Sequence, residues 1–182
     1  DKACLLSGAR LLTLHIPSCG YSILQTPVPE AMVMTDFNSS FNTKLEDDLM
    51  KYEGIGVGPG IGTASETKMM LREIFDTYRN PVVLDADALN IIASQKDLLN
   101  LVPVGSILTP HPKEFERLFG EAANDFDRVR LALEKAKELS SIIILKGHHT
   151  FIATPDGRGF FNSTGNPGMA TPGSGDVLTG IL

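Results

Sequence analysis

Few cysteines, few basic residues and no long apolar run set the first limits on this chain of 182 residues. Cys4 and Cys19 are too few for a disulfide scaffold or a cysteine-based metal site, and they fit a reducing cytoplasm. No apolar run approaches the ~18 residues that a membrane-spanning helix needs. A formal net charge of −6 indicates no basic face for nucleic acid. We therefore expect a cytoplasmic protein with neither a membrane nor a nucleic-acid partner.

The composition is that of a globular protein. Hydrophobic residues make up 42%, charged residues 21%, and the mean hydropathy is +0.04. The 17 glycines and 11 prolines form no repeat and predict tight turns and ligand-cradling loops. No composition break divides residues 1–182, so we expect a single domain. The chain starts at Asp1 and ends at Leu182 inside an apolar pattern, and we expect this domain to be truncated at both ends.

Strand-like and helix-like segments alternate along the chain. Strands are expected at 10–16, 30–35, 52–57, 81–84, 105–108 and 141–145. Helices are expected at 64–78, 87–94, 111–119 and 125–139. Pro155-Asp156-Gly157 predicts a hairpin. Apolar strands separated by helices predict an α/β fold, with three α/β/α layers around a mostly parallel central sheet.

In such sheets ligands bind where the strands end, and four unusual clusters stand at such ends. The first is glycine-rich and occupies residues 56–63, with Gly58, Gly60 and Gly62 at alternating positions. These glycines allow positive φ angles and a close approach of a ligand to the main chain. A plain tight turn would use the same residues, so this cluster alone leaves both interpretations open.

The second cluster follows the predicted strand 81–84 and contains Asp85, Asp87 and Asn90. Two carboxylates at a strand end can hold Mg²⁺ through water or bind substrate hydroxyls. The alternative is that one of them caps the next helix.

The third cluster follows strand 105–108. Pro112 fits the first turn of a helix, which places His111 and Glu114 near that helix N-terminus. A capping box from Thr109 is out of register, so we expect capping not to explain Glu114. His111 is either structural or part of the site.

The fourth cluster combines residues 146–150, which follow strand 141–145, with the long segment 162–176. A Gly-Ser-Gly turn at 173–175 opens a helical pattern, so several N–H groups converge on one point and form an anion hole. Asp176 falls in the first turn of that helix. It can act as a general base toward an incoming hydroxyl.

These residues carry a family resemblance that covers nearly the whole chain. Gly173-Ser174-Gly175-Asp176 resembles the G-(A/T/S)-G-D anion-hole motif of the ribokinase-like superfamily. The wider set is similar to one branch of it, the ADP/ATP-dependent NAD(P)H-hydrate dehydratases. Five segments follow the order of that family: GVGPGIG (56–62), DADALN (85–90), TPHPKE (109–114), KGHHT (146–150) and NPGMATPGSGD (166–176).

The resemblance implies repair of damaged nicotinamide cofactors. Such an enzyme dehydrates (6S)-NADHX or NADPHX to NADH or NADPH. It converts ADP to AMP, or ATP to ADP, and releases phosphate. Magnesium would be bound through the nucleotide, with no direct protein ligand assigned.

The resemblance also implies a role for each motif. Asp176 would be the base, and the N–H groups of Gly173, Ser174 and Gly175 would hold the transferred phosphate. The nucleotide-binding residues would be Lys146, Gly147, His148, His149, Thr150, Asn166, Gly168, Met169, Ala170 and Gly175. The substrate-binding residues would be Gly58, Gly60, Gly62, Asp85, Asp87, Asn90, His111, Glu114 and Asp176.

Two other functions fit the same motifs. One is a ribokinase-superfamily kinase acting on a hydroxymethylpyrimidine or a sugar. The other is an inactive nucleotide-binding module. Members of the family commonly associate, so we also expect a homo-oligomer.

Overall fold

The computed structural model describes residues 2–182. Its helices are α1 (Lys2–Leu6), α2 (Tyr21–Gln25), α3 (Ser65–Thr77), α4 (Ala86–Ser94), α5 (Pro112–Phe119), α6 (Asp125–Glu138) and α7 (Ser174–Ile181). Its strands are β1 (Thr13–Pro17), β2 (Met32–Asp36), β3 (Ile55–Val57), β4 (Val82–Leu84), β5 (Ile107–Leu108), β6 (Ile142–Leu145), β7 (Thr150–Ala153) and β8 (Gly159–Asn162). Short 3-10 turns are η1 (Ser18–Gly20), η2 (Leu49–Lys51), η3 (Lys96–Leu101) and η4 (Pro167–Met169).

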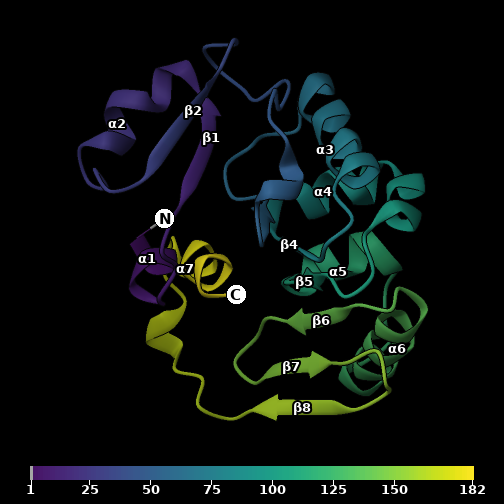
Figure 1. Cartoon of the computed structure of the whole chain (residues 1–182). Helices are drawn as coiled ribbons and strands as arrows, with labels where there is room; N and C mark the ends of the chain where they lie inside the picture. The colour runs from purple at the N-terminus through teal and green to yellow at the C-terminus, as the bar shows by residue number, and fades with distance from the viewer. Residues whose placement is uncertain (1) are drawn as a thin grey trace.

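The main sheet has six strands in the order β3-β4-β5-β6-β7-β8. The first four strands are parallel, and β6, β7 and β8 pair antiparallel. This confirms both the mostly parallel sheet and the hairpin predicted at Asp156-Gly157. β1 and β2 pair with each other in a separate parallel sheet of two strands (Figure 1). The sequence pattern predicts both strands but not this separation.

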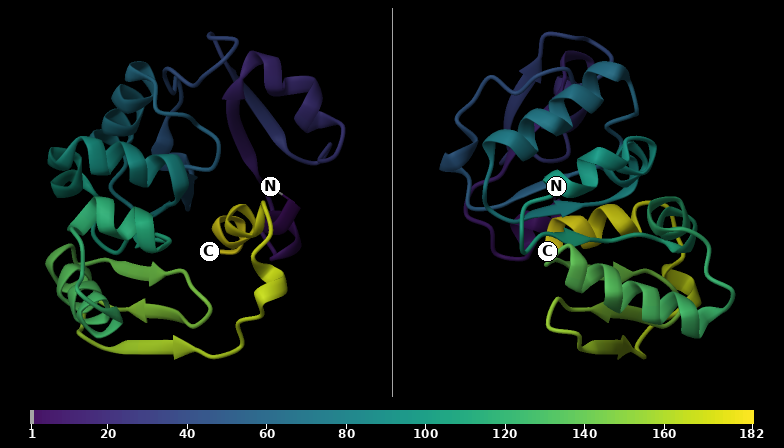
Figure 2. Two further views of the ribbon diagram at one scale, coloured as in Figure 1. Left: turned by 180° about the vertical axis from the view of Figure 1, so that it is seen from behind. Right: turned by 90° about the vertical axis from the view of Figure 1, so that its right-hand side faces the viewer.

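Helices lie on both faces of the main sheet. Each step from β3 to β6 moves to the neighbouring strand, so right-handed connections place α3, α4, α5 and α6 on one face. Figures 1 and 2 show this layer, with α1 and α7 on the opposite side. A Cβ on Gly56 of β3 would lie 3.4 Å from Cγ2 of Thr179, which places α7 against the sheet. The predicted three-layer architecture is thus confirmed.

The main core lies between the sheet and the layer of α3 to α6. α3 buries Met70, Leu71, Ile74 and Phe75 along one stripe, as its helical spacing predicts. Burial of each such side chain contributes about 1.5–3 kcal/mol. A second cluster packs α6 and Phe115 of α5 against β6 and β7. This packing fixes the direction of the parallel strands and therefore the edge at which they end.

The sequence pattern misses α1 and α2. Each is five residues long and has no fully buried residue, so neither shows an apolar stripe. α1 packs against α7, where a Cβ on Gly180 would lie 3.2 Å from the backbone nitrogen of Cys4. Within residues 2–182, no helix has the length and apolar character needed to cross a membrane.

Candidate active site

A partly buried ion pair joins the ends of β4 and β6. Nζ of Lys146 lies 2.5 Å from Oδ1 of Asp85, whose side chain is only 2% exposed. Asp85 occupies the N-cap position of α4, but its side chain makes no capping hydrogen bond. The carboxylate instead receives Lys146 and, at Oδ2, the hydroxyl of Thr179 of α7 at 3.1 Å. The capping alternative therefore does not describe Asp85.

The glycine-rich loop after β3 is held against the end of β4 by contact between their backbones, at Gly58 and Asp85. Gly58, Gly60 and Gly62 all have positive φ, as expected for a cradling or tightly turning loop. The N–H of Gly62 donates to Oδ2 of Asp87 at 2.9 Å. Asp87 thus fixes the shape of this loop, and the sequence alone does not predict that pairing.

His111 and Glu114 form the capping box of α5, which corrects the expectation that capping does not explain Glu114. Nδ1 of His111 accepts from the N–H groups of Lys113 and Glu114 at 3.1 and 3.2 Å. Oε2 of Glu114 accepts the N–H of His111 at 2.8 Å. The box starts at the histidine rather than at Thr109, and histidine is an uncommon N-cap residue. The buried Glu114 carboxylate still lies 4.0 Å from Nζ of Lys146.

Asn90 stands apart from these groups in its contacts. Its Oδ1 accepts from the guanidinium of Arg117 at 2.8 Å, which links α4 to α5. The structure therefore gives Asn90 a packing contact between helices. Its role in substrate binding stays a prediction.

The first turn of α7 faces the Asp85–Lys146 pair. Gly173 takes a left-handed conformation with φ 89° at the N-cap, and the helix starts at Ser174. Among residues 2–182, no acceptor is present for the N–H groups of Gly175 and Asp176. A Cβ on Gly175 would lie 3.3 Å from Oδ2 of Asp85 and 3.6 Å from Nζ of Lys146. The exposed Asp176 lies in the same turn.

The remaining predicted nucleotide contacts lie on two loops that approach each other. The rings of His148 and His149 stand edge to face with centroids 4.4 Å apart, on the turn between β6 and β7. Thr150 donates to the carbonyl of Gly147 in that turn at 3.3 Å. A Cβ on Gly165 would fall 1.9 Å from the carbonyl oxygen of His148, so the loop after β8 lies directly against it.

The same loop carries the other predicted nucleotide residues. Oδ1 of Asn166 accepts the N–H of Gly168 at 2.8 Å and caps η4, while Met169 and Ala170 follow on the surface. The N-cap Asn166 thus explains the shape of the turn. Its contact with a nucleotide stays a prediction.

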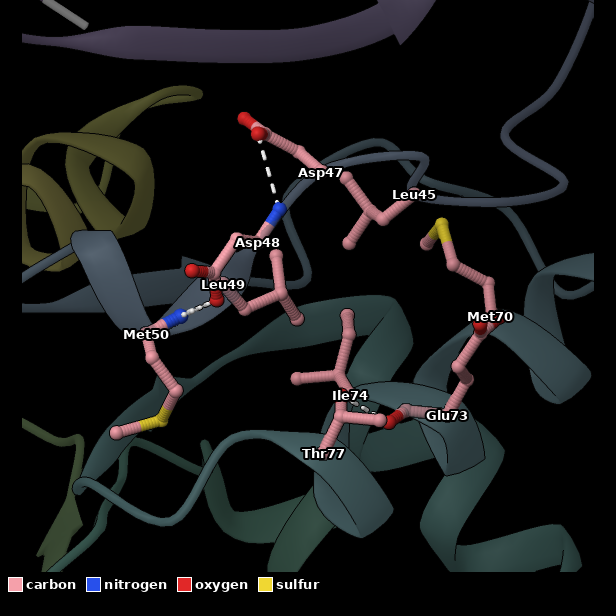
Figure 3. A pocket seen from close by; sticks show the side chains of 9 residues that line it. All are labelled: Leu45, Asp47, Asp48, Leu49, Met50, Met70, Glu73, Ile74 and Thr77. Carbon is pink, nitrogen blue, oxygen red and sulfur yellow. Dashed lines mark hydrogen bonds between the residues drawn. The ribbon is translucent and has the colours of Figure 1, made fainter.

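A cavity of about 240 Å³ lies elsewhere, beside α3 (Figure 3). It is lined by Leu45, Asp47, Asp48, Leu49, Met50, Met70, Glu73, Ile74 and Thr77. Its two aspartates already accept hydrogen bonds. Asp47 binds Lys51 and Tyr52, and Asp48 caps η2. The cavity shares no residue with the predicted site.

Fold and site together define the class of protein. A largely parallel sheet between helical layers is the fold that this chain shares with ribokinase-like proteins. Ribokinase from Giardia lamblia shares this fold alone, with a TM-score of 0.56 and 13% identity. The family model for NAD(P)H-hydrate dehydratase matches residues 1–182, and the chain belongs to this family.

Individual relatives agree with that assignment. The bifunctional NAD(P)H-hydrate repair enzyme Nnr of Moorella thermoacetica is 38% identical over 189 residues, covering 99% of this chain and 36% of its own. The ADP-dependent (S)-NAD(P)H-hydrate dehydratase of Neisseria meningitidis is 41% identical over 144 residues, covering 75% of this chain and 49% of its own. The chain thus spans between a third and a half of the length of these relatives.

A solved relative supports the fold in detail. The ADP/ATP-dependent NAD(P)H-hydrate dehydratase of Bacillus subtilis, co-crystallised with ATP and Mg²⁺, superposes with a TM-score of 0.78 at 32% identity. The match covers 98% of this chain and 64% of that one.

Proposed function

We propose that this chain carries the site that dehydrates (6S)-NADHX and NADPHX at the expense of ADP or ATP. The observation that supports it most is that the first turn of α7, which carries Asp176, lies against the Asp85–Lys146 pair at one sheet edge. A Cβ on Gly175 would lie 3.6 Å from Nζ of Lys146, and the N–H groups of Gly175 and Asp176 have no acceptor among residues 2–182. Phosphoryl transfer needs positioning and charge stabilisation more than covalent chemistry, and these groups provide both.

Asp176 would accept the proton of the C6 hydroxyl, and the freed oxygen would bond to the terminal phosphorus of the nucleotide. The phosphorus–oxygen bond to AMP, or to ADP when ATP is used, breaks in the same transfer. The C6–O bond then breaks with its electrons going to phosphate, and loss of a C5 proton restores the ring double bond. The amides of Gly173 and Gly175 would hold the transferred group throughout, whereas the predicted third donor, the N–H of Ser174, donates to the carbonyl of Thr171 at 3.3 Å.

The hydrate would lie on the glycine-rich loop of Gly58, Gly60 and Gly62, beside His111 and Glu114. The nucleotide would lie between the turn after β6 and the loop before α7. Magnesium brought with the nucleotide phosphates supplies neutralising charge.

We further propose that residues 1–182 form one domain, that the protein acts as a homo-oligomer, and that it works in the cytoplasm. Phe119 packs against both hydrophobic clusters of the main sheet, which supports the first point. The metabolite substrates and the two free cysteines, Cys4 and Cys19, fit the last point.

The test is to incubate the chain with the hydrate, Mg²⁺ and either ADP or ATP, and to follow the absorbance of reduced nicotinamide together with free phosphate. The variant Asp176→Asn should lose about 10²- to 10⁴-fold in kcat while still binding nucleotide. Asp97→Asn is the matched control, because Asp97 is an exposed partner of Arg72 in the first turn of η3.

The alternatives give different results in the same assay. Accumulation of a stable phosphorylated alcohol without reduced nicotinamide would show a kinase. Nucleotide binding with no turnover by the wild-type chain would show a binding module.

A further inference from the structure

We infer that Asp85 is a positioning residue, which holds Lys146 and the anion-hole helix α7 in one fixed arrangement at the ends of β4 and β6. The inference rests on the proposed function, because it concerns how that site is kept in order. The resemblance assigns Asp85 to the lining of the substrate cleft. Its contacts in the structure instead run to two other parts of the machinery.

The two oxygens of the Asp85 carboxylate serve different elements. Oδ1 receives the ammonium of Lys146 at 2.5 Å, and Oδ2 receives the hydroxyl of Thr179 at 3.1 Å. Because the Asp85 side chain is only 2% exposed, little water can solvate its charge. Lys146 and Thr179 offset the free-energy cost of burying that charge. The pairs are 61 and 94 residues apart in sequence. One buried group therefore connects β4, β6 and α7 (Figure 1).

The backbone around Asp85 is consistent with a side chain directed to Lys146 and Thr179. The next residue, Ala86, has a φ of 47°, a left-handed conformation that is unfavourable for a non-glycine residue. The N–H of Asp85 donates to the carbonyl of Val57 at 3.1 Å, which fixes the residue to the end of β3. Asp85 stands at an N-cap position yet gives up the capping bond, so its side chain is directed to Lys146 and Thr179.

Thr179 links Asp85 to the helix that bears the proposed reacting groups. It lies on α7 one turn after Asp176, and its hydroxyl is also 3.2 Å from the carbonyl of Gly175. A shift of α7 would move the amides of Gly175 and Asp176 together with the Asp176 carboxylate. Without Asp85, the remaining carboxylate near Lys146 is that of Glu114, 4.0 Å away. We expect the ammonium to turn toward it.

The contribution of the Thr179 hydroxyl to holding α7 can be tested by substitutions that remove no charge. Thr179→Val deletes the bond to Asp85, and Thr179→Ser keeps it. Thr77→Val is the matched control, because the hydroxyl of Thr77 bonds only the carbonyl of Glu73 in its own helix. Asp85→Asn is measured alongside, since it keeps an acceptor for Thr179 but loses the charge that holds Lys146.

Two readouts are needed. Amide hydrogen exchange of Val177 to Gly180 should accelerate about 10-fold in Thr179→Val, the effect expected from losing one hydrogen bond to a charged group. In the dehydratase assay, Thr179→Val should lower kcat by roughly 10²-fold, as expected from a misplaced reacting group, with the nucleotide KM little changed. Thr179→Ser should restore both, and Thr77→Val should match the wild type.

The outcomes separate the inference from the function on which it rests. Unchanged exchange of α7 in both Thr179→Val and Asp85→Asn would overturn the inference, whatever the activity. Faster exchange with an unchanged kcat would also overturn it, because α7 would then be held without effect on the reaction. If the wild-type chain shows no turnover, the proposed function fails. The exchange rates then decide alone whether Asp85 holds α7.

Discussion

A Cβ atom on Gly58 would lie 1.8 Å from the carbonyl oxygen of Asp85, so the loop after β3 is in direct backbone contact with the end of β4. Gly58 has a φ of 142°, which other residues rarely adopt. The close approach of the ends of β3 and β4 therefore requires glycine at position 58. A Cβ built on Gly60, in contrast, would have no heavy atom of residues 2–182 within 4 Å, its chain neighbours aside.

This difference predicts unequal costs for two alanine substitutions in one loop. Gly58→Ala should destabilise the chain by roughly 2–4 kcal/mol, because it combines the unfavourable φ with displacement of the Asp85 backbone. Gly60→Ala should cost about 1 kcal/mol, from its φ of 68° alone. Urea unfolding midpoints measure both, and equal losses would contradict the role given to the contact.

A substitution of Asp87 tests how well the glycine-rich loop is ordered, rather than how stable the whole fold is. Its carboxylate accepts the N–H of Gly62 at 2.9 Å, and the pair is exposed to solvent. Asp87→Ala should free the loop and raise the KM for the hydrate about 5-fold, the effect of one lost hydrogen bond of ~1 kcal/mol. Asp87→Asn keeps an acceptor and should have a smaller effect. A rise confined to the nucleotide KM would show that the loop serves the other substrate.

The order of the strands and of helices α3 to α7 could be predicted from the sequence, because apolar periodicity and strand-end glycines are local signals. The rule that ligands bind where parallel strands end also placed the four clusters at one edge. The partners of individual side chains could not be predicted. Lys146 with Asp85, and Asn90 with Arg117, are contacts made by packing between distant segments.

The error at Glu114 has a different cause. Its capping partner is close in sequence, but the N-cap is His111 instead of the usual serine, threonine, aspartate or asparagine. The sequence does not mark Thr179 as a functional residue, because a threonine inside a short apolar helix usually has only a packing role. Its bond to Asp85 is visible only once α7 is placed against the sheet.

A third buried carboxylate, Asp36 at the end of β2, predicts how stability depends on pH. Its side chain is only 1% exposed and accepts from Asn38, from both the N–H and the hydroxyl of Thr43, and from Lys44. Burial by itself would raise the pKa of Asp36. The hydrogen bonds outweigh burial and hold that pKa at about 2. Nε2 of His15 lies 3.4 Å away.

The pKa in the folded state is thus below the value of about 3.9 for an unfolded chain. The carboxylate therefore stabilises the fold at pH values above about 4, and this contribution is lost as the pH falls from about 4 toward 2. Asp36→Asn should lower the free energy of unfolding by roughly 2–3 kcal/mol at pH 7, because three N–H groups and a hydroxyl lose a charged acceptor.

The difference between wild type and Asp36→Asn should narrow when unfolding is measured at pH 3, because the unfolded wild-type chain then binds a proton at Asp36 that the folded chain largely does not. Asp97→Asn is the control, since Asp97 pairs with Arg72 at the surface and such pairs contribute about 0–1 kcal/mol. A difference that stays constant from pH 7 to pH 3 would show that the ionised carboxylate of Asp36 does not stabilise this end of β2.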